Sequence, residues 1–116
     1  MRPPSHDDIF KLEEWAQGSL PLMAAVHLLT HSRKRYKVWT ILVRRDDRDR
    51  PWLDAEGAAR HLDAFGLSRG ERAFVLLVIE LADFDTDTPL AELLCRIDPA
   101  DSVTFFEAAR VLTRGV

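Results

Sequence analysis

Residues 68–84 read SRGERAFVLLVIELADF, and this stretch decides the fold. Ser68 followed three residues later by Glu71 is a capping box, which opens a helix by satisfying its first free N–H groups. Residues 73–79 are apolar without a break, so every side of the predicted helix needs protein around it. A membrane span needs about 20 apolar residues, and this run is much shorter. The sequence therefore predicts a buried central helix.

Helical signals recur on both sides of this stretch. Ser5 with Asp8 forms a second capping box, and Ser19 precedes an apolar run that ends near residue 29. Asp54 is a third candidate N-cap, and Thr88 before a proline is a fourth helix start. The predicted fold class is all-α, a compact orthogonal or bundle-like packing of five to six helices around the central one. We expect residues 1–116 to form a single helical domain.

Apolar spacing predicts which sides of the later helices face the core. In the helix over 54–65 the inner stripe is predicted to consist of Ala58, Leu62 and Phe65. The last helix begins at Asp98–Pro99 or at Ser102. Its predicted inward residues are Val103, Phe106, Ala109 and Leu112.

Residues 33–45, RKRYKVWTILVRR, fit either a helix or a strand. Val38, Ile41 and Val43 have strand propensity, but a single strand has no evident partner here. As a helix, Tyr36, Trp39 and Val43 share one face. We favour the helix, followed by a turn or loop over 46–51, because Pro51 disfavours a helical residue before it.

Charge is distributed unevenly along the chain. Residues 33–50 hold eight basic and three acidic residues, net +5, whereas the whole chain has a net charge of −3. Such an asymmetry is typical of an interaction surface. The predicted contact residues are Arg33, Arg35, Tyr36, Trp39, Arg44, Arg45 and Trp52.

Two kinds of partner fit this basic and aromatic surface. Arginine beside aromatic rings binds a phosphate backbone and stacks on bases, which makes nucleic acid the alternative. However, Asp46, Asp47 and Asp49 lie in the same stretch and repel phosphate. We therefore expect a non-catalytic regulatory or adaptor protein that contacts another protein or, as a homodimer, a second copy of itself.

No catalytic, cofactor or metal site is predicted. His27 and His31 have the spacing of metal ligands on one helix face, but a third ligand, such as His61 or Cys95, cannot be placed from sequence. Residues 83–88 alternate aspartates like a calcium loop, but lack its glycine and its final glutamate. Glu80 is expected near the surface or paired with an arginine such as Arg60 or Arg110. The lone cysteine, Cys95, is expected in the core.

Four segments carry a resemblance to known proteins: AAVHLLTH (24–31), PWLDAEGAARHLDAF (51–65), LSRGERAFVLLVIELAD (67–83) and RIDPADSVTFFEAARVL (96–112). In this order they resemble a family of small helical actinobacterial proteins with no assigned activity. The resemblance implies a helical fold and a bacterial source. The single cysteine and the absence of an apolar signal segment after Met1 favour the cytoplasm rather than secretion or a membrane.

Overall fold

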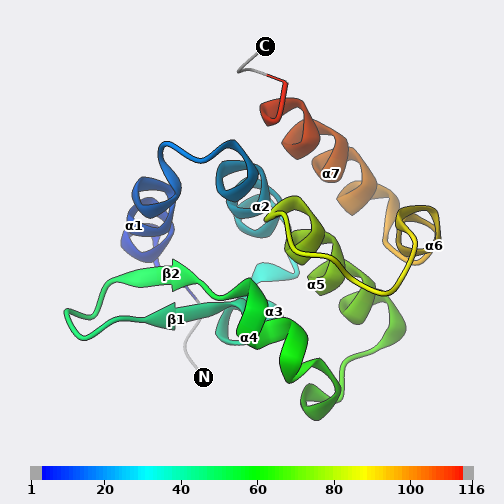
Figure 1. Cartoon of the computed structure of the whole chain (residues 1–116), viewed down its shortest axis with the longest axis horizontal. Helices are drawn as coiled ribbons and strands as arrows, with labels where there is room; N and C mark the ends of the chain where they lie inside the picture. The colour runs from blue at the N-terminus through cyan, green and yellow to red at the C-terminus, as the bar shows by residue number, and fades with distance from the viewer. Residues whose placement is uncertain (1–3, 114–116) are drawn as a thin grey trace.

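A central helix organises the structure. The computed structural model describes residues 4–113, and helix α5 (Arg69–Leu81) lies in its middle (Figure 1). Both hydrogen bonds of the capping box form: Ser68 Oγ accepts from the Glu71 amide at 3.2 Å, and Glu71 Oε1 accepts from the Ser68 amide at 3.0 Å. Every residue from 73 to 79 is buried. The predicted buried central helix is confirmed.

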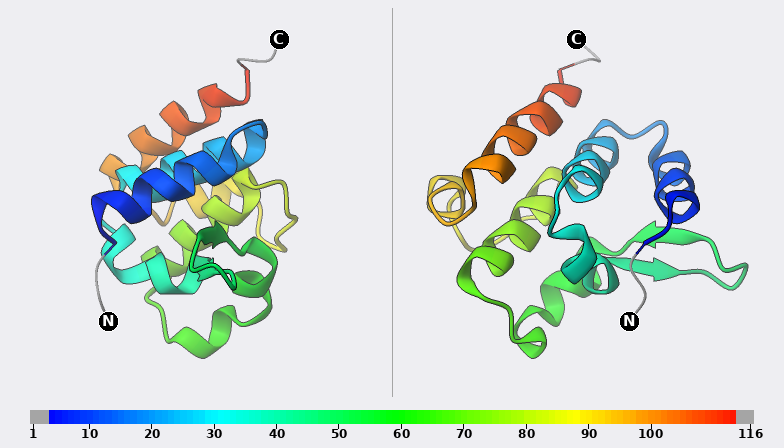
Figure 2. Two further views of the ribbon diagram at one scale, coloured as in Figure 1. Left: turned by 90° about the vertical axis from the view of Figure 1, so that its left-hand side faces the viewer. Right: turned by 180° about the vertical axis from the view of Figure 1, so that it is seen from behind.

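Helix α2 (Leu20–His31) lies beside α5 as the second core helix. Ser19 caps it, because its Oγ accepts from the Leu22 amide at 3.3 Å. α2 also packs against the first helix, α1 (His6–Ala16), and the last helix, α7 (Pro99–Val111). Figure 2 shows α1 and α7 on opposite sides of α2. The two terminal helices therefore cover α2 from two directions.

Helices dominate the rest of the chain as well. Between residues 4 and 113 the structure has seven α-helices and one 3-10 helix. The remaining ones are α3 (Arg35–Leu42), α4 (Ala55–Arg60), the 3-10 helix η1 (Leu62–Phe65) and α6 (Leu90–Leu94). The all-α class is confirmed, with more helices than the five or six predicted. Within the described residues, no helix combines the length and the apolar character that crossing a bilayer requires.

The stretch 33–45 forms a helix and then a strand. Helix α3 is followed by strand β1 (Val43–Arg45), which pairs antiparallel with strand β2 (Pro51–Leu53). Asp46 holds the turn between them, because its Oδ1 accepts from the amides of Arg48 and Arg50 at 2.9 Å each. The helix prediction is right only up to residue 42. The partner strand could not be predicted from the sequence, because β2 has only three residues and begins with a proline.

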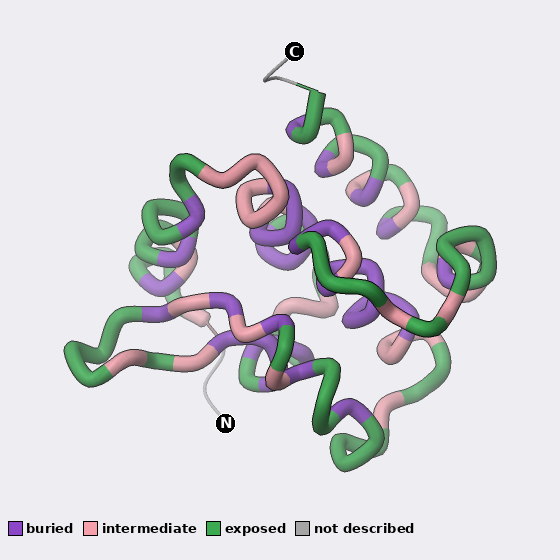
Figure 3. The backbone as a smooth tube through the Cα atoms, viewed as in Figure 1, coloured by how far each residue is buried: buried purple, intermediate pink, exposed green. Residues whose placement is uncertain are grey.

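The predicted inward face of α7 is wrong. The buried residues of α7 are Asp101, Phe105, Ala108 and Val111. Of the predicted residues, Val103 is 61% exposed, Phe106 58% and Leu112 39%. Ser32 Oγ donates a buried hydrogen bond of 2.7 Å to Asp101 Oδ1, and this polar contact turns Asp101 toward α2. The side of α7 that carries Val103 and Phe106 consequently faces solvent, as Figure 3 shows along the outer edge of the helix.

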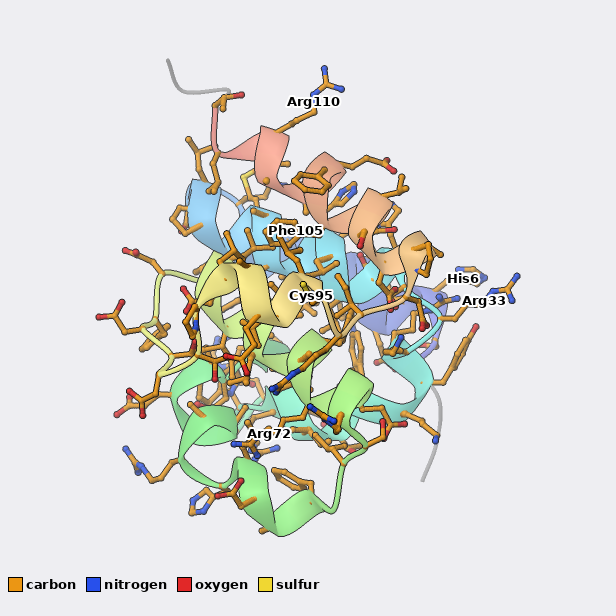
Figure 4. The ribbon with its side chains drawn as sticks, turned by 90° about the vertical axis from the view of Figure 1, so that its right-hand side faces the viewer. His6, Arg33, Arg72, Cys95, Phe105 and Arg110 are labelled. Carbon is orange, nitrogen blue, oxygen red and sulfur yellow. The ribbon has the colours of Figure 1, made fainter. Side chains whose placement is uncertain are left out.

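Three smaller expectations also need correction. α7 begins at Pro99, so the alternative start at Ser102 is wrong. Phe65 is 38% exposed rather than internal, because the predicted helix ends at residue 60 and a 3-10 turn follows, which rotates successive side chains differently. Cys95 is exposed at the end of the short helix α6 (Figure 4), where only Leu93 reaches the core fully.

Candidate protein interaction surfaces

The basic stretch 33–50 is largely neutralised inside the fold. Five of its eight cations face carboxylates, at N–O distances of 2.5 to 3.7 Å. The pairs are Lys34 with Asp98 and Asp101, Lys37 with Glu71, Arg44 with Asp54, Arg45 with Asp8, and, within the stretch itself, Arg50 with Asp46. All the partners except Asp46 belong to α7, α5, α4 and α1 or their caps. The stretch thus joins four helices, which explains its charge without any external ligand.

Lys34 is the most enclosed of these cations. Its ammonium group donates to Asp101 at 2.5 Å and to Asp98 at 2.7 Å, and its side chain is only 16% exposed. Burial lowers the pKa of Lys34, but the hydrogen bonds and charges of the two aspartates outweigh burial and raise its pKa above the ordinary value. The cluster of Ser32, Lys34 and Asp101 fastens the turn before α3 to the start of α7.

A second ion pair fastens the hairpin to α1. Arg45 donates to Asp8 Oδ1 at 2.5 Å, and Asp8 is buried. The hydrogen bond from the Ser5 amide is the main cause that lowers the pKa of Asp8 to about 2, and Arg45 lowers it further, while burial opposes both. Arg45 is therefore a structural residue as well as a member of the predicted contact surface.

The structure divides the seven predicted contact residues. Trp39 is 6% exposed and belongs to the core, so its assignment to a surface is wrong. The physical reason is that α3 contacts α2, α4 and α5, and Trp39 is among the four residues that α3 buries. Tyr36 is 51% exposed and lies under the Arg35 guanidinium, 4.4 Å from its ring centre. Arg35 also donates to the Ser32 carbonyl at 2.9 Å.

The remaining predicted contact residues lie apart from this aromatic pair. Arg44 and Trp52 are half-buried and face each other across the hairpin, where Arg45 is also found. Arg33 is exposed in the turn between α2 and α3, on the side seen in Figure 4, and makes no ion pair with any residue from 4 to 113. The predicted surface is therefore two separate groups, one at the start of α3 and one on the hairpin.

His27 and His31 stack on one face of α2. Their ring centres are 4.0 Å apart, and His31 Nδ1 lies 3.0 Å from the His27 carbonyl oxygen. They border a cavity of about 160 Å³ between α1, α2 and α7, together with Glu13, Gln17 and Met23. Among the described residues, no three histidine, cysteine or carboxylate side chains lie close enough to hold a metal ion. The two histidines therefore line this small cavity.

Glu80 anchors the loop that follows α5. Its Oε1 accepts from the Thr86 hydroxyl at 2.6 Å and from the Thr86 amide at 3.3 Å. Of the two alternatives expected for Glu80, a position near the surface agrees with its half-buried side chain. Pairing with Arg60 or Arg110 is wrong, since Arg60 pairs with Glu56 and no ion pair joins Arg110 to another residue in the described range. The aspartates of residues 83–87 are exposed on this loop. Glu80 therefore shapes the loop.

The outer side of α7 carries the most exposed apolar pair. Val103 and Phe106 lie one helical turn apart, so their side chains are neighbours. Glu107 and Arg110 lie on the same exposed side, and Figure 4 shows Arg110 pointing away from the body of the molecule. Neither charge has an ion-pair partner between residues 4 and 113. We call Val103, Phe106, Glu107 and Arg110 the α7 strip.

The sequence contained a signal for the α7 strip that apolar spacing alone did not resolve. α7 has large apolar residues on two sides: Phe105 and Val111 inside, and Val103 and Phe106 outside. A helix that is apolar on two sides generally has protein on both sides. Apolar spacing identifies an apolar stripe on a helix, but it cannot show which of two such stripes packs against the core.

Comparison with protein-family models, curated proteins and solved structures finds no match to this chain. The resemblance to small actinobacterial helical proteins therefore rests on the sequence segments alone.

Proposed function

We propose that this chain is a non-catalytic protein of the cytoplasm that acts through contacts with other proteins, and that the α7 strip is its contact surface. One observation carries the proposal: Val103 and Phe106 are neighbours and more than half exposed, on a helix whose opposite side is in the core. Aromatic residues and arginine are enriched at protein interfaces. The strip contains one of each, with an aliphatic neighbour.

The state of the basic stretch supports the same proposal. A surface that binds through charge needs cations free to meet the ligand, and most cations of residues 33–50 are already bound to carboxylates. Lys34 and Arg45 are paired with the buried Asp101 and Asp8, so freeing either cation leaves a buried carboxylate unpaired, which costs energy. Exposed apolar area is available at α7 without any such cost.

Site-specific photocross-linking in cells that make the chain tests this proposal. A benzophenone amino acid replaces Phe106 in one variant and Phe10 in another. Phe10 is the matched control, since it is 60% exposed against 58% for Phe106 but lies on α1, on the other side of α2 (Figure 1). We expect a protein adduct from position 106, absent from position 10 and lost when Val103→Asp is added. No adduct at 106, or equal adducts at both positions, would contradict the proposal.

Nucleic-acid binding through residues 33–50 is the second candidate. It is favoured by Arg33 and Arg48, which are exposed without an ion-pair partner in the range 4–113, and by the exposed ring of Tyr36. Phosphate contacts release counterions, so such binding weakens steeply with salt. Charge reversal at Arg33 and Arg48 leaves the internal ion pairs intact. Duplex or single-stranded DNA binding at physiological salt, abolished by this reversal, would establish the second candidate over the first.

A further inference from the structure

We infer that the α7 strip binds a second copy of this chain, with the two α7 helices antiparallel about a two-fold axis near Phe106. This inference rests on the proposed function and names the partner. A two-fold interface uses the same patch on both subunits, so the patch has to be complementary to itself. The α7 strip meets this requirement in shape and in charge.

Phe106 and Val103 make the α7 strip complementary to itself in shape. In an antiparallel pair centred beside Phe106, the two Phe106 rings lie side by side. With the axis between Phe106 and Glu107, positions 103 and 110 are equally far from it and come level with each other across the interface. Val103 of one copy therefore lies against the aliphatic stem of Arg110 of the second copy, twice by symmetry. Long basic side chains commonly cover apolar surface in this way.

Glu107 and Arg110 make the α7 strip complementary to itself in charge. The two residues have opposite charge, are three positions apart, and have no ion-pair partner within residues 4–113. In the antiparallel arrangement, the Arg110 guanidinium of one copy lies within about one helical turn of Glu107 of the other. Both side chains border one hollow, which His27 of α2 and Thr113 also line. Each dimer would hold two such pairs.

The single opposite-charge pair on each strip favours a second copy over an unrelated partner. A patch that binds a basic or an acidic partner needs charges of one sign only. The α7 strip carries one negative and one positive residue, and a two-fold axis brings Glu107 of each copy near Arg110 of the other. The size of the contact sets its strength. A helix of 13 residues is about 20 Å long, so two such faces bury less than the roughly 1,200 Å² of a standard interface. We therefore expect a weak dimer, with a dissociation constant in the micromolar range.

Sedimentation equilibrium of the full chain, over protein concentrations from micromolar to millimolar, tests the inference. We expect a monomer–dimer equilibrium in the wild type. Phe106→Glu should weaken dimerisation at least about 30-fold, as loss of a central aromatic contact does. Phe10→Glu, an equally exposed change on α1, should leave it unchanged. Circular dichroism checks that each variant is folded.

A charge swap tests the two-fold arrangement itself. Glu107→Arg alone and Arg110→Glu alone each place like charges together and should weaken dimerisation about fivefold. The double variant, Glu107→Arg with Arg110→Glu, restores both pairs in a homodimer and should return the dissociation constant close to the wild-type value. A double variant no tighter than the single ones would overturn the inference.

Two further outcomes separate this inference from the proposed function. A wild type that stays monomeric up to millimolar concentration, while position 106 still cross-links to a different protein, overturns the second copy and leaves the contact surface standing. A monomer without any adduct at position 106 overturns both. A dimer that Phe106→Glu does not weaken also overturns the inference, because its contact lies elsewhere.

Discussion

Ser32 donates a buried hydrogen bond of 2.7 Å to Asp101, 69 residues later in the chain. The bond lies on the side of α7 that also buries Phe105, Ala108 and Val111. Lys34 binds the other oxygen of the same carboxylate. Polar and apolar contacts therefore hold the same side of α7 inward and leave Val103 and Phe106 exposed.

The first prediction follows from that bond. Ser32→Ala removes one donor from the buried Asp101 carboxylate and should lower the free energy of unfolding by about 1–3 kcal/mol. Ser102→Ala is the control, because Ser102 is only half-buried and lies next to Asp101 on the same helix. It should change stability by less than about 0.5 kcal/mol. Urea denaturation measures both, and equal effects would show that the Ser32 bond does not hold α7.

A second prediction concerns Gly57 in the first turn of α4. The Asp54 carboxylate accepts from the Gly57 amide at 2.9 Å, and a Cβ at position 57 would lie 2.2 Å from Asp54 Oδ2. Gly57→Ala should therefore displace the cap, and this loss of about 1 kcal/mol offsets what alanine gains over glycine in a helix, so stability should change little.

The same change should stabilise the fold when the cap is absent. In an Asp54→Ala background there is nothing to displace, and alanine is a better helix former than glycine by about 1 kcal/mol. Thermal unfolding of the four proteins of this cycle measures the difference between the two backgrounds. Stabilisation by Gly57→Ala in both backgrounds would refute the close approach.

The third prediction is a pH dependence that originates at Asp8. Its pKa in the folded chain is about 2, below the ordinary value of 3.8. A carboxyl whose pKa is lowered on folding stabilises the fold above its ordinary pKa, and this contribution disappears as the pH falls toward the folded value. The difference in unfolding free energy between wild type and Asp8→Asn should be constant at neutral pH and shrink between pH 3.8 and about 2.

The exposed Asp47 supplies the control for this titration. It forms no ion pair with another residue in the range 4–113, so Asp47→Asn should change stability little throughout. Denaturant unfolding at a series of pH values gives both differences. An Asp8→Asn difference that stays constant down to pH 2 would argue against the Ser5 and Arg45 contacts.

The local part of the fold could be predicted from the sequence. The capping boxes at Ser5 and Ser68 and the apolar run over 73–79 depend on residues a few positions apart, and the structure confirms them. The hairpin escaped prediction because each strand has only three residues, too few for an alternating pattern. Sequence patterns therefore predict features that depend on residues within one helix. They do not predict a strand whose partner is short and lies elsewhere in the chain.

The candidate sites depended on distant partners throughout. Arg45 and Asp8 are 37 residues apart, and Lys34 and Asp101 are 67 residues apart. No spacing rule connects residues so far apart in the sequence. The ion pairs that neutralise the basic stretch could therefore not be predicted, and its charge indicated an exposed interaction surface. The burial of Trp39 likewise depends on how α3 packs against distant helices, which the local sequence does not show.

The rotation of α7 is the central claim, since both proposals need Phe106 outside and Phe105 inside. Thermal unfolding of Phe105→Ala and Phe106→Ala, at a protein concentration low enough to keep the chain monomeric, tests it most directly. Phe105 is 6% exposed and Phe106 is 58% exposed. We predict a loss of about 3–5 kcal/mol for Phe105→Ala and less than about 1 kcal/mol for Phe106→Ala. The opposite order would show that α7 is turned the other way and would contradict the account.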